Sequence, residues 1–255
     1  MADAKRLIFI AGAEGSGTTL LLRLLAGPAT CVALGGNYRK IPVGAAAEAL
    51  AAAFDVANQR AWDRTLSIAD HEKALADWRR AADAIAASPY FADRSRLIYK
   101  RSYPFGTPRG RFSPVLADVA DQFEDSRIVA IYRDPRAASY SALRRGFDTD
   151  IRRLAIVCAE QLTLLAAEVR ALPPERVRVV DYGALLSQPE AVLGGLYAFC
   201  GIPADSLRTI VAREGIKAGT DMRFAKELLP SEAAWLNTFF DARRLKQWDN
   251  LLPPD

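Results

Sequence analysis

Short apolar runs alternate along the chain with longer segments whose apolar residues recur every three or four positions. The runs are rich in β-branched and aromatic residues, which is typical of buried strands in a parallel sheet. Four of them lie at residues 7–10, 97–99, 127–132 and 177–180, and a weaker fifth at 31–34.

The intervening segments have helical periodicity. Ala74, Trp78 and Ile85, for example, fall on one face of a helix. Asp134 followed by Pro135 is a typical helix start, with an N-cap and then proline in the first turn. Helices are predicted at residues 18–26, 45–57, 70–87, 134–145, 150–171, 189–199 and 230–244. Alternating strands and helices predict an α/β fold of three layers, with a central parallel sheet flanked by helices.

The organisation of the chain predicts a single domain over residues 1–255. Its 255 residues contain no repeat and no long linker, and this length is sufficient for one large core. The segment at about 43–94 is mostly helical and reads as an insertion between strands. A Gly-, Pro- and Arg-rich loop is expected at 102–113.

The composition of the chain excludes several classes of function. The chain has 34 basic and 30 acidic residues, an excess too small to indicate nucleic-acid binding, although it suits an anionic ligand if basic residues converge. Three dispersed cysteines and one histidine predict no metal site and free thiols in a reducing compartment. The first apolar run is too short for a signal peptide or membrane span. A cytoplasmic protein without a membrane partner is therefore expected.

The first motif is a glycine-rich turn between the first strand and the first helix. Gly12 and Gly17 have the spacing of the phosphate-binding P-loop, GxxxxGK[ST]. Such a turn points backbone N–H groups at an anion, assisted by the helix N-terminus. Thr18, however, stands where the lysine of nucleoside triphosphatases reaches the β- and γ-phosphates. The loop is therefore expected to hold a 5′-phosphate that lacks a γ-phosphate.

The second motif covers residues 127–141 and again joins a buried strand to a capped helix. Arg133 lies at the carboxyl end of the strand, where ligands bind in parallel sheets. A guanidinium is suited to a phosphate because it offers paired donors. Ser141 follows about two helical turns later and can donate a hydroxyl.

Together these motifs resemble PAPS-dependent sulfotransferases, which use 3′-phosphoadenylyl sulfate (PAPS) and release 3′,5′-ADP (PAP). Ser16-Gly17-Thr18-Thr19 resembles their 5′-phosphosulfate loop, and the Arg133–Ser141 segment resembles their 3′-phosphate motif. The resemblance implies a metal-independent reaction and donor contacts from these loop and helix residues: Gly12, Gly15, Ser16, Gly17, Thr18, Thr19, Arg133 and Ser141. Gly15 departs from the family, which has lysine or arginine there.

Three further segments resemble the family more weakly. The stretch 179–185 is similar to a Tyr-Glu-Asp-Leu segment, which places Tyr182 by the nucleotide. Residues 216–219 are similar to part of a basic loop, which makes Lys217 a 3′-phosphate contact. Lys100 matches a catalytic lysine in a segment similar to Lys-Thr-His-x-Pro. Each of these residues could instead be an ordinary strand-end or loop residue.

The sequence leaves several candidates for the general base. Ser102 stands at the family's histidine position, and the stretch 35–39 lacks the carboxylate of a second family pattern. The remaining candidates are His71 in the helical insertion, Glu14 in the loop, or no base if the acceptor is already activated.

We expect a hydroxyl or amine acceptor on a small molecule, glycan or peptide, bound by the insertion at 43–94. Two other functions stay open. One is a degenerate P-loop kinase or NTPase, and the other is a non-catalytic PAP- or PAPS-binding module.

Overall fold

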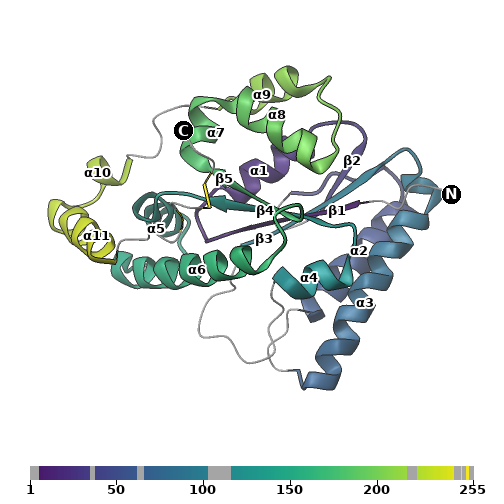
Figure 1. Cartoon of the computed structure of the whole chain (residues 1–255), viewed down its shortest axis with the longest axis horizontal. Coiled ribbons are helices and arrows are strands. Elements are labelled where there is room, and N and C mark those ends of the chain that lie inside the picture. Colours follow the sequence, from purple (N-terminus) through teal and green to yellow (C-terminus); the bar gives the residue numbers. More distant parts are fainter. Residues whose placement is uncertain are drawn as a thin grey trace.

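Five parallel strands form the centre of the molecule (Figure 1). The computed structural model describes residues 6–34, 38–61, 66–102, 116–216, 223–243, 248 and 251–252. The strand order is β2-β3-β1-β4-β5. Their bounds are β1 Arg6–Gly12, β2 Cys31–Leu34, β3 Arg96–Ser102, β4 Arg127–Tyr132 and β5 Val177–Asp181.

Helices cover both faces of the sheet, as Figure 1 shows. On one face lie α1 Thr18–Leu25, α7 Tyr182–Ser187, α8 Pro189–Cys200 and α9 Leu207–Glu214. On the other lie α2 Ala45–Ala61, α3 Ile68–Ala87, α4 Leu116–Gln122 and α6 Ile151–Ala171, with the 3₁₀ turn η1 Pro89–Phe91. At the carboxyl ends of the strands lie α5 Pro135–Arg144, α10 Phe224–Glu227 and α11 Pro230–Arg243. The predicted three-layer α/β fold is confirmed.

Alternating side chains on β1 divide the core between the two faces. Phe9 packs with Trp78 and Tyr99 in the layer that contains α3. Ile8 and Ile10 point the other way, into the layer that contains α1 and α8. Because both faces are buried, the strands read as continuous apolar runs in the sequence.

The structure extends several predicted elements and adds short ones. The strand predicted at 97–99 runs from Arg96 to Ser102, and the helix predicted at 45–57 continues to Ala61. Helices α4, α7, α9 and α10 were not expected from the sequence. Most of the loop predicted at 102–113 lies outside the described residues.

The predicted insertion contains the hairpin of α2 and α3, whose residues contribute to the main core. Its role in binding an acceptor, and the assignment of the chain as one domain, remain predictions. Within the described part of the chain, no helix has both the length and the apolar character needed to cross a membrane.

Parallel register brings the ends of β1, β3 and β4 to one edge of the sheet. Gly12 pairs with Ser102 on β3 and with Ile131 on β4. The glycine-rich loop, Lys100 and Arg133 therefore meet at this edge, which is where parallel sheets bind ligands.

Candidate functional site

The loop between β1 and α1 depends on its glycines. Gly17 has φ 96°, in the left-handed region that favours glycine. A Cβ there would lie 2.5 Å from the Tyr182 ring, and one on Gly12 would lie 2.4 Å from Ser16 Oγ. Larger residues at either position would push the loop apart, so both glycines are required by its present shape.

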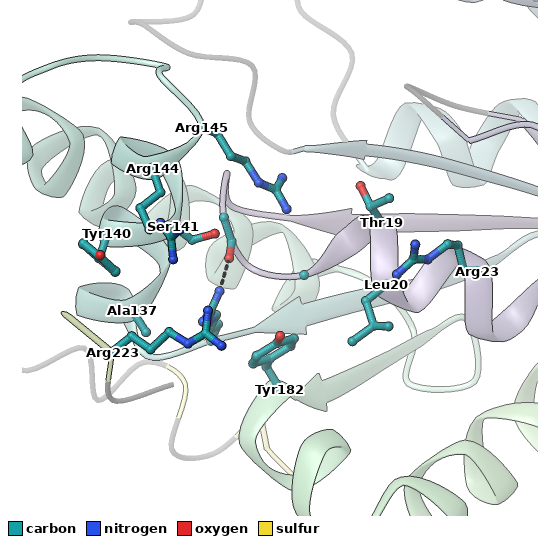
Figure 2. A pocket seen from close by; sticks show the side chains of 13 residues that line it. Thr19, Leu20, Arg23, Ala137, Tyr140, Ser141, Arg144, Arg145, Tyr182 and Arg223 are labelled. Carbon is teal, nitrogen blue, oxygen red and sulfur yellow. Dashed lines mark hydrogen bonds between the residues drawn. The ribbon is translucent and has the colours of Figure 1, made fainter. Parts of the chain in front are cut away.

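Gly15 also has a positive φ, 81°, and it packs against α5. A Cβ at this position would lie 2.1 Å from the carbonyl oxygen of Ala138, a backbone atom that cannot easily move. Arg133 Nη1 donates to the Gly15 carbonyl at 2.7 Å, the dashed contact in Figure 2. This backbone therefore excludes the lysine or arginine that the family has here, because either would require a Cβ.

The N-terminus of α1 opens without a side-chain cap. Its N-cap residue is Gly17, and among the residues that the structure describes no side chain caps the first amides. By contrast, Asp134 caps α5 by accepting from the Arg136 amide at 2.8 Å. The buried Ser16 hydroxyl has no hydrogen-bond partner among the described residues. Uncapped amides and an orphan hydroxyl at a helix N-terminus are suited to a phosphate.

A cavity of about 580 Å³ lies beside this loop, between α1, α5 and α7. Arginines from several elements face it, and among the described residues no carboxylate lines it. Figure 2 shows the side chains that surround it. The wall consists of Gly15, Gly17, Thr19, Leu20, Arg23, Arg133, Ala137, Tyr140, Ser141, Arg144, Arg145, Tyr182 and Arg223. Such a surface is suited to a ligand that carries several negative charges.

Six residues predicted from the two phosphate motifs and the Tyr182 segment meet on this wall: Gly15, Gly17, Thr19, Arg133, Ser141 and Tyr182. Arg133 is buried, and its guanidinium lies 4.5 Å from the centre of the Tyr182 ring. Gly12, Ser16 and Thr18 belong to the loop but do not line the cavity, and Ser16 and Thr18 are buried. Lys217 lies outside the described residues.

Lys100 is half-buried at the end of β3 and shares a local field with Glu14 and Arg145. Burial lowers the pKa of Lys100, the charge of Arg145 lowers it further, and Glu14 opposes this shift. Burial also raises the pKa of the Glu14 carboxyl, while Arg145 and Lys100 lower it. Two cations and one carboxylate therefore cluster at the mouth of the loop.

His71 lies elsewhere. A surface position would be usual for a lone histidine near a helix start, but His71 is only 8% exposed, on α3, and it does not line the cavity. Its Nδ1 has no hydrogen-bond partner in the described part of the chain. The structure thus brings Glu14, rather than His71, next to Lys100.

Sequence reasoning missed most of the cavity's positive charge: Arg23, Arg144, Arg145 and Arg223. Helical spacing could have indicated two of them. Arg23 follows Thr19 by four residues on α1, and Arg145 follows Ser141 by four at the end of α5. Residues four apart lie on the same side of a helix.

A model of the sulfotransferase family matches residues 7–206, which include the loop, β4, α5 and Tyr182. The chain belongs to the sulfotransferase family. This membership confirms the family expected from the two motifs, and it supports a transferase enzyme that moves a sulfuryl group. No curated protein matches the chain.

Solved sulfotransferase structures share the fold. The sulfotransferase domain of the Synechococcus PCC 7002 olefin synthase is 18% identical, with TM-score 0.56 over 94% of this chain and 96% of that one. The Alicyclobacillus acidocaldarius sulfotransferase is 17% identical, with TM-score 0.52 over 95% of each chain. A mouse sulfotransferase complexed with PAP is 13% identical, with TM-score 0.54 over 96% and 89%.

The described residues of this sulfotransferase contain no group of three or more His, Cys, Asp or Glu side chains that could hold a metal ion. A metal-independent reaction stays a prediction.

Proposed function

We propose that this sulfotransferase uses PAPS as its donor and transfers the sulfuryl group to a hydroxyl or amine of a small-molecule, glycan or peptide acceptor. One observation carries the proposal: the two phosphate motifs, far apart in sequence, line one cavity. The loop, with Gly15, Gly17 and Thr19, forms one part of the wall. Arg133 and Ser141 form another, together with Tyr182.

The residues fit the two ends of this donor. Uncapped amides of α1 and Thr19 would hold the 5′-phosphosulfate, with the buried Ser16 hydroxyl behind the loop. Arg133 and Ser141 would hold the 3′-phosphate, with Arg133 kept in place by the Gly15 carbonyl and the Tyr182 ring. Thr18 leaves the loop without the lysine that a γ-phosphate requires, which disfavours the kinase alternative.

The reaction follows from this arrangement. The acceptor oxygen or nitrogen bonds to sulfur as the bond from sulfur to the bridging phosphate oxygen breaks. The sulfated acceptor forms, PAP leaves with the electron pair of the broken bond, and the acceptor proton goes to a base. As in phosphoryl transfer, positioning and charge stabilisation are expected to supply most of the rate. Lys100 is the candidate cation beside the loop.

Glu14 is the base that we favour, because it belongs to the donor loop and its charge interacts with that of Lys100, although like His71 it does not line the cavity. It is half-buried in the donor loop, and its pKa, raised by burial, makes it a stronger proton acceptor than an exposed carboxylate. Lys100 and Arg145 nearby offset its repulsion from an anionic donor. Glu14 would then face the acceptor across the transferring group.

The donor is tested by thermal stabilisation of the full chain. PAP at about 100 times its dissociation constant adds about 2.7 kcal/mol to the free energy of unfolding, a readable rise in Tm. ATP with magnesium should give a smaller rise, because Thr18 replaces the lysine. Stronger protection by ATP would overturn the proposal in favour of a kinase or NTPase.

Turnover is tested separately with ³⁵S-labelled PAPS and a panel of alcohols, phenols, amines, sugars and tyrosine peptides. We expect label in at least one acceptor and stoichiometric release of PAP. Tight PAP binding with no label transferred to any acceptor, and no release of PAP above the uncatalysed rate, would favour a non-catalytic binding module.

A further inference from the structure

Arg145 occupies a defined position at the end of α5. Gly146, with φ 73°, ends the helix: its amide donates to Leu143 at 2.9 Å and the Phe147 amide donates to Ala142 at 3.3 Å. This pair of bonds is a Schellman motif, which fixes the backbone just after a helix. Arg145 is the C-cap residue of that motif. Figure 2 shows its side chain extending over the phosphate loop toward Thr19.

Three of the four other arginines that line the cavity have contacts of their own. Arg133 is buried beneath the loop, where it binds the Gly15 carbonyl. Arg23 lies 3.1 Å from Glu214, and Arg144 lies 3.6 Å from Glu227, so each is in an ion pair. In the described part of the chain, Arg145 forms no ion pair with a carboxylate. Its charge is therefore available to a ligand in the cavity.

Arg145 lies close to a loop that lacks a basic side chain. The Gly15 backbone excludes any side chain, so no cation can project from that residue. Arg145 reaches the same loop from α5, and it is close enough to Glu14 and Lys100 to act on the charge of both. Two cations held close together repel each other, and an anion bound between them relieves this repulsion.

We propose that Arg145 is a catalytic residue that binds the oxygens of the sulfuryl group, in the donor and during transfer, and so supplies a positive charge that Gly15 cannot carry. This inference rests on the proposed use of PAPS. It assigns a different task to each arginine: Arg133 holds the 3′-phosphate, and Arg145 acts at the other end, beside Lys100.

The assignment predicts discrimination between PAPS and PAP, which differ only by the sulfuryl group. Calorimetric titration of Arg145→Gln, without acceptor, should show PAP affinity within about threefold of wild type and PAPS affinity about tenfold weaker. The kcat for label transfer should fall about 100-fold. Arg145→Lys keeps the charge and should recover part of both losses.

Arg153→Gln is the matched control, because it removes the same charge from an exposed position on α6 where Arg153 pairs with Asp150. It should bind both nucleotides and turn over like wild type. Equal weakening of PAP and PAPS by Arg145→Gln would overturn the inference by making Arg145 a phosphate anchor. Behaviour identical to Arg153→Gln would overturn it as well. Failure of wild type to bind PAP would instead count against the proposed donor.

Discussion

Single residues decide which side chains the glycine-rich loop can carry. In the sequence, Gly15 stands where the family has a basic side chain, which suggests that a catalytic group has been lost. The structure gives the reason: its positive φ and its contact with the Ala138 carbonyl leave no room for a Cβ. The missing charge is present nearby on Arg145, a residue that the sequence motif does not include.

Glu14→Gln tests the base at the same scale. We expect kcat to fall at least 100-fold, because general-base catalysis contributes about 10²–10⁴ in rate. PAP affinity should stay level or rise, since a carboxylate near an anion is removed. In wild type, burial raises the pKa of Glu14, so kcat should rise with pH through that raised pKa and then level off. This rising limb should vanish in Glu14→Gln.

His71→Gln is measured alongside on the same acceptor and across the same pH range. If Glu14 is the base, replacement of the buried His71 should leave the shape of the pH profile unchanged even if the protein loses stability. If the limb disappears in His71→Gln and persists in Glu14→Gln, the assignment of the base is reversed.

At the scale of elements, α1 depends on a residue outside it. Lys40 Nζ donates to the carbonyls of Ala26, Gly27 and Pro28 at 2.6, 2.9 and 2.6 Å, just past the end of α1. Lys40→Met keeps an unbranched apolar side chain as far as Cε and removes Nζ with all three charge-assisted bonds. The free energy of unfolding should fall by about 2 kcal/mol in urea titrations.

Lys73→Met on the exposed face of α3 removes the same charge and should stay within about 0.5 kcal/mol of wild type. Equal stability of Lys40→Met and Lys73→Met would show that the three carbonyls are solvated without Lys40.

The elements differ in how well the sequence predicts them. The five strands follow from continuous apolar runs, because both of their faces are buried, and the long helices follow from the periodicity of one buried face. Helix α4 has only seven residues, too few to show a period. Residues distant in sequence secure it instead: Glu168 accepts from the Leu116 amide at 2.7 Å, and Arg176 Nη2 donates to the Ala120 carbonyl at 3.1 Å. The sequence pattern around α4 therefore gives no indication of these contacts.

At the scale of the whole molecule, the same contrast applies to the site. Both phosphate motifs could be predicted because each lies within one strand-loop-helix unit, and parallel pairing brings their ends together. Arg144 and Arg223, by contrast, converge on the cavity only through the packing of α5 and α10. The sequence therefore predicts which motifs meet at the cavity better than which charges complete its wall.

Glu168 makes the stability of the fold depend on pH, because its carboxyl joins α6 to the start of α4 by accepting from the Leu116 amide. Burial raises the pKa of its carboxyl from 4.5 to about 7. Between these values the folded protein binds more protons at this carboxyl than the unfolded chain, so the contribution of Glu168 to stability is fully present below pH 4.5 and is lost as pH rises through 7. For this partly exposed group we expect a loss of about 1–2 kcal/mol.

Glu168→Gln retains an oxygen that can accept from the Leu116 amide but cannot ionise. In urea titrations at pH 5, 6, 7 and 8 it should remove this decline and be more stable than wild type at pH 8. Glu160→Gln, at an exposed position on the same helix, should keep the wild-type slope. A wild-type slope in Glu168→Gln would show that the contact between α4 and α6 tolerates the charged carboxylate, and that burial does not hold its proton.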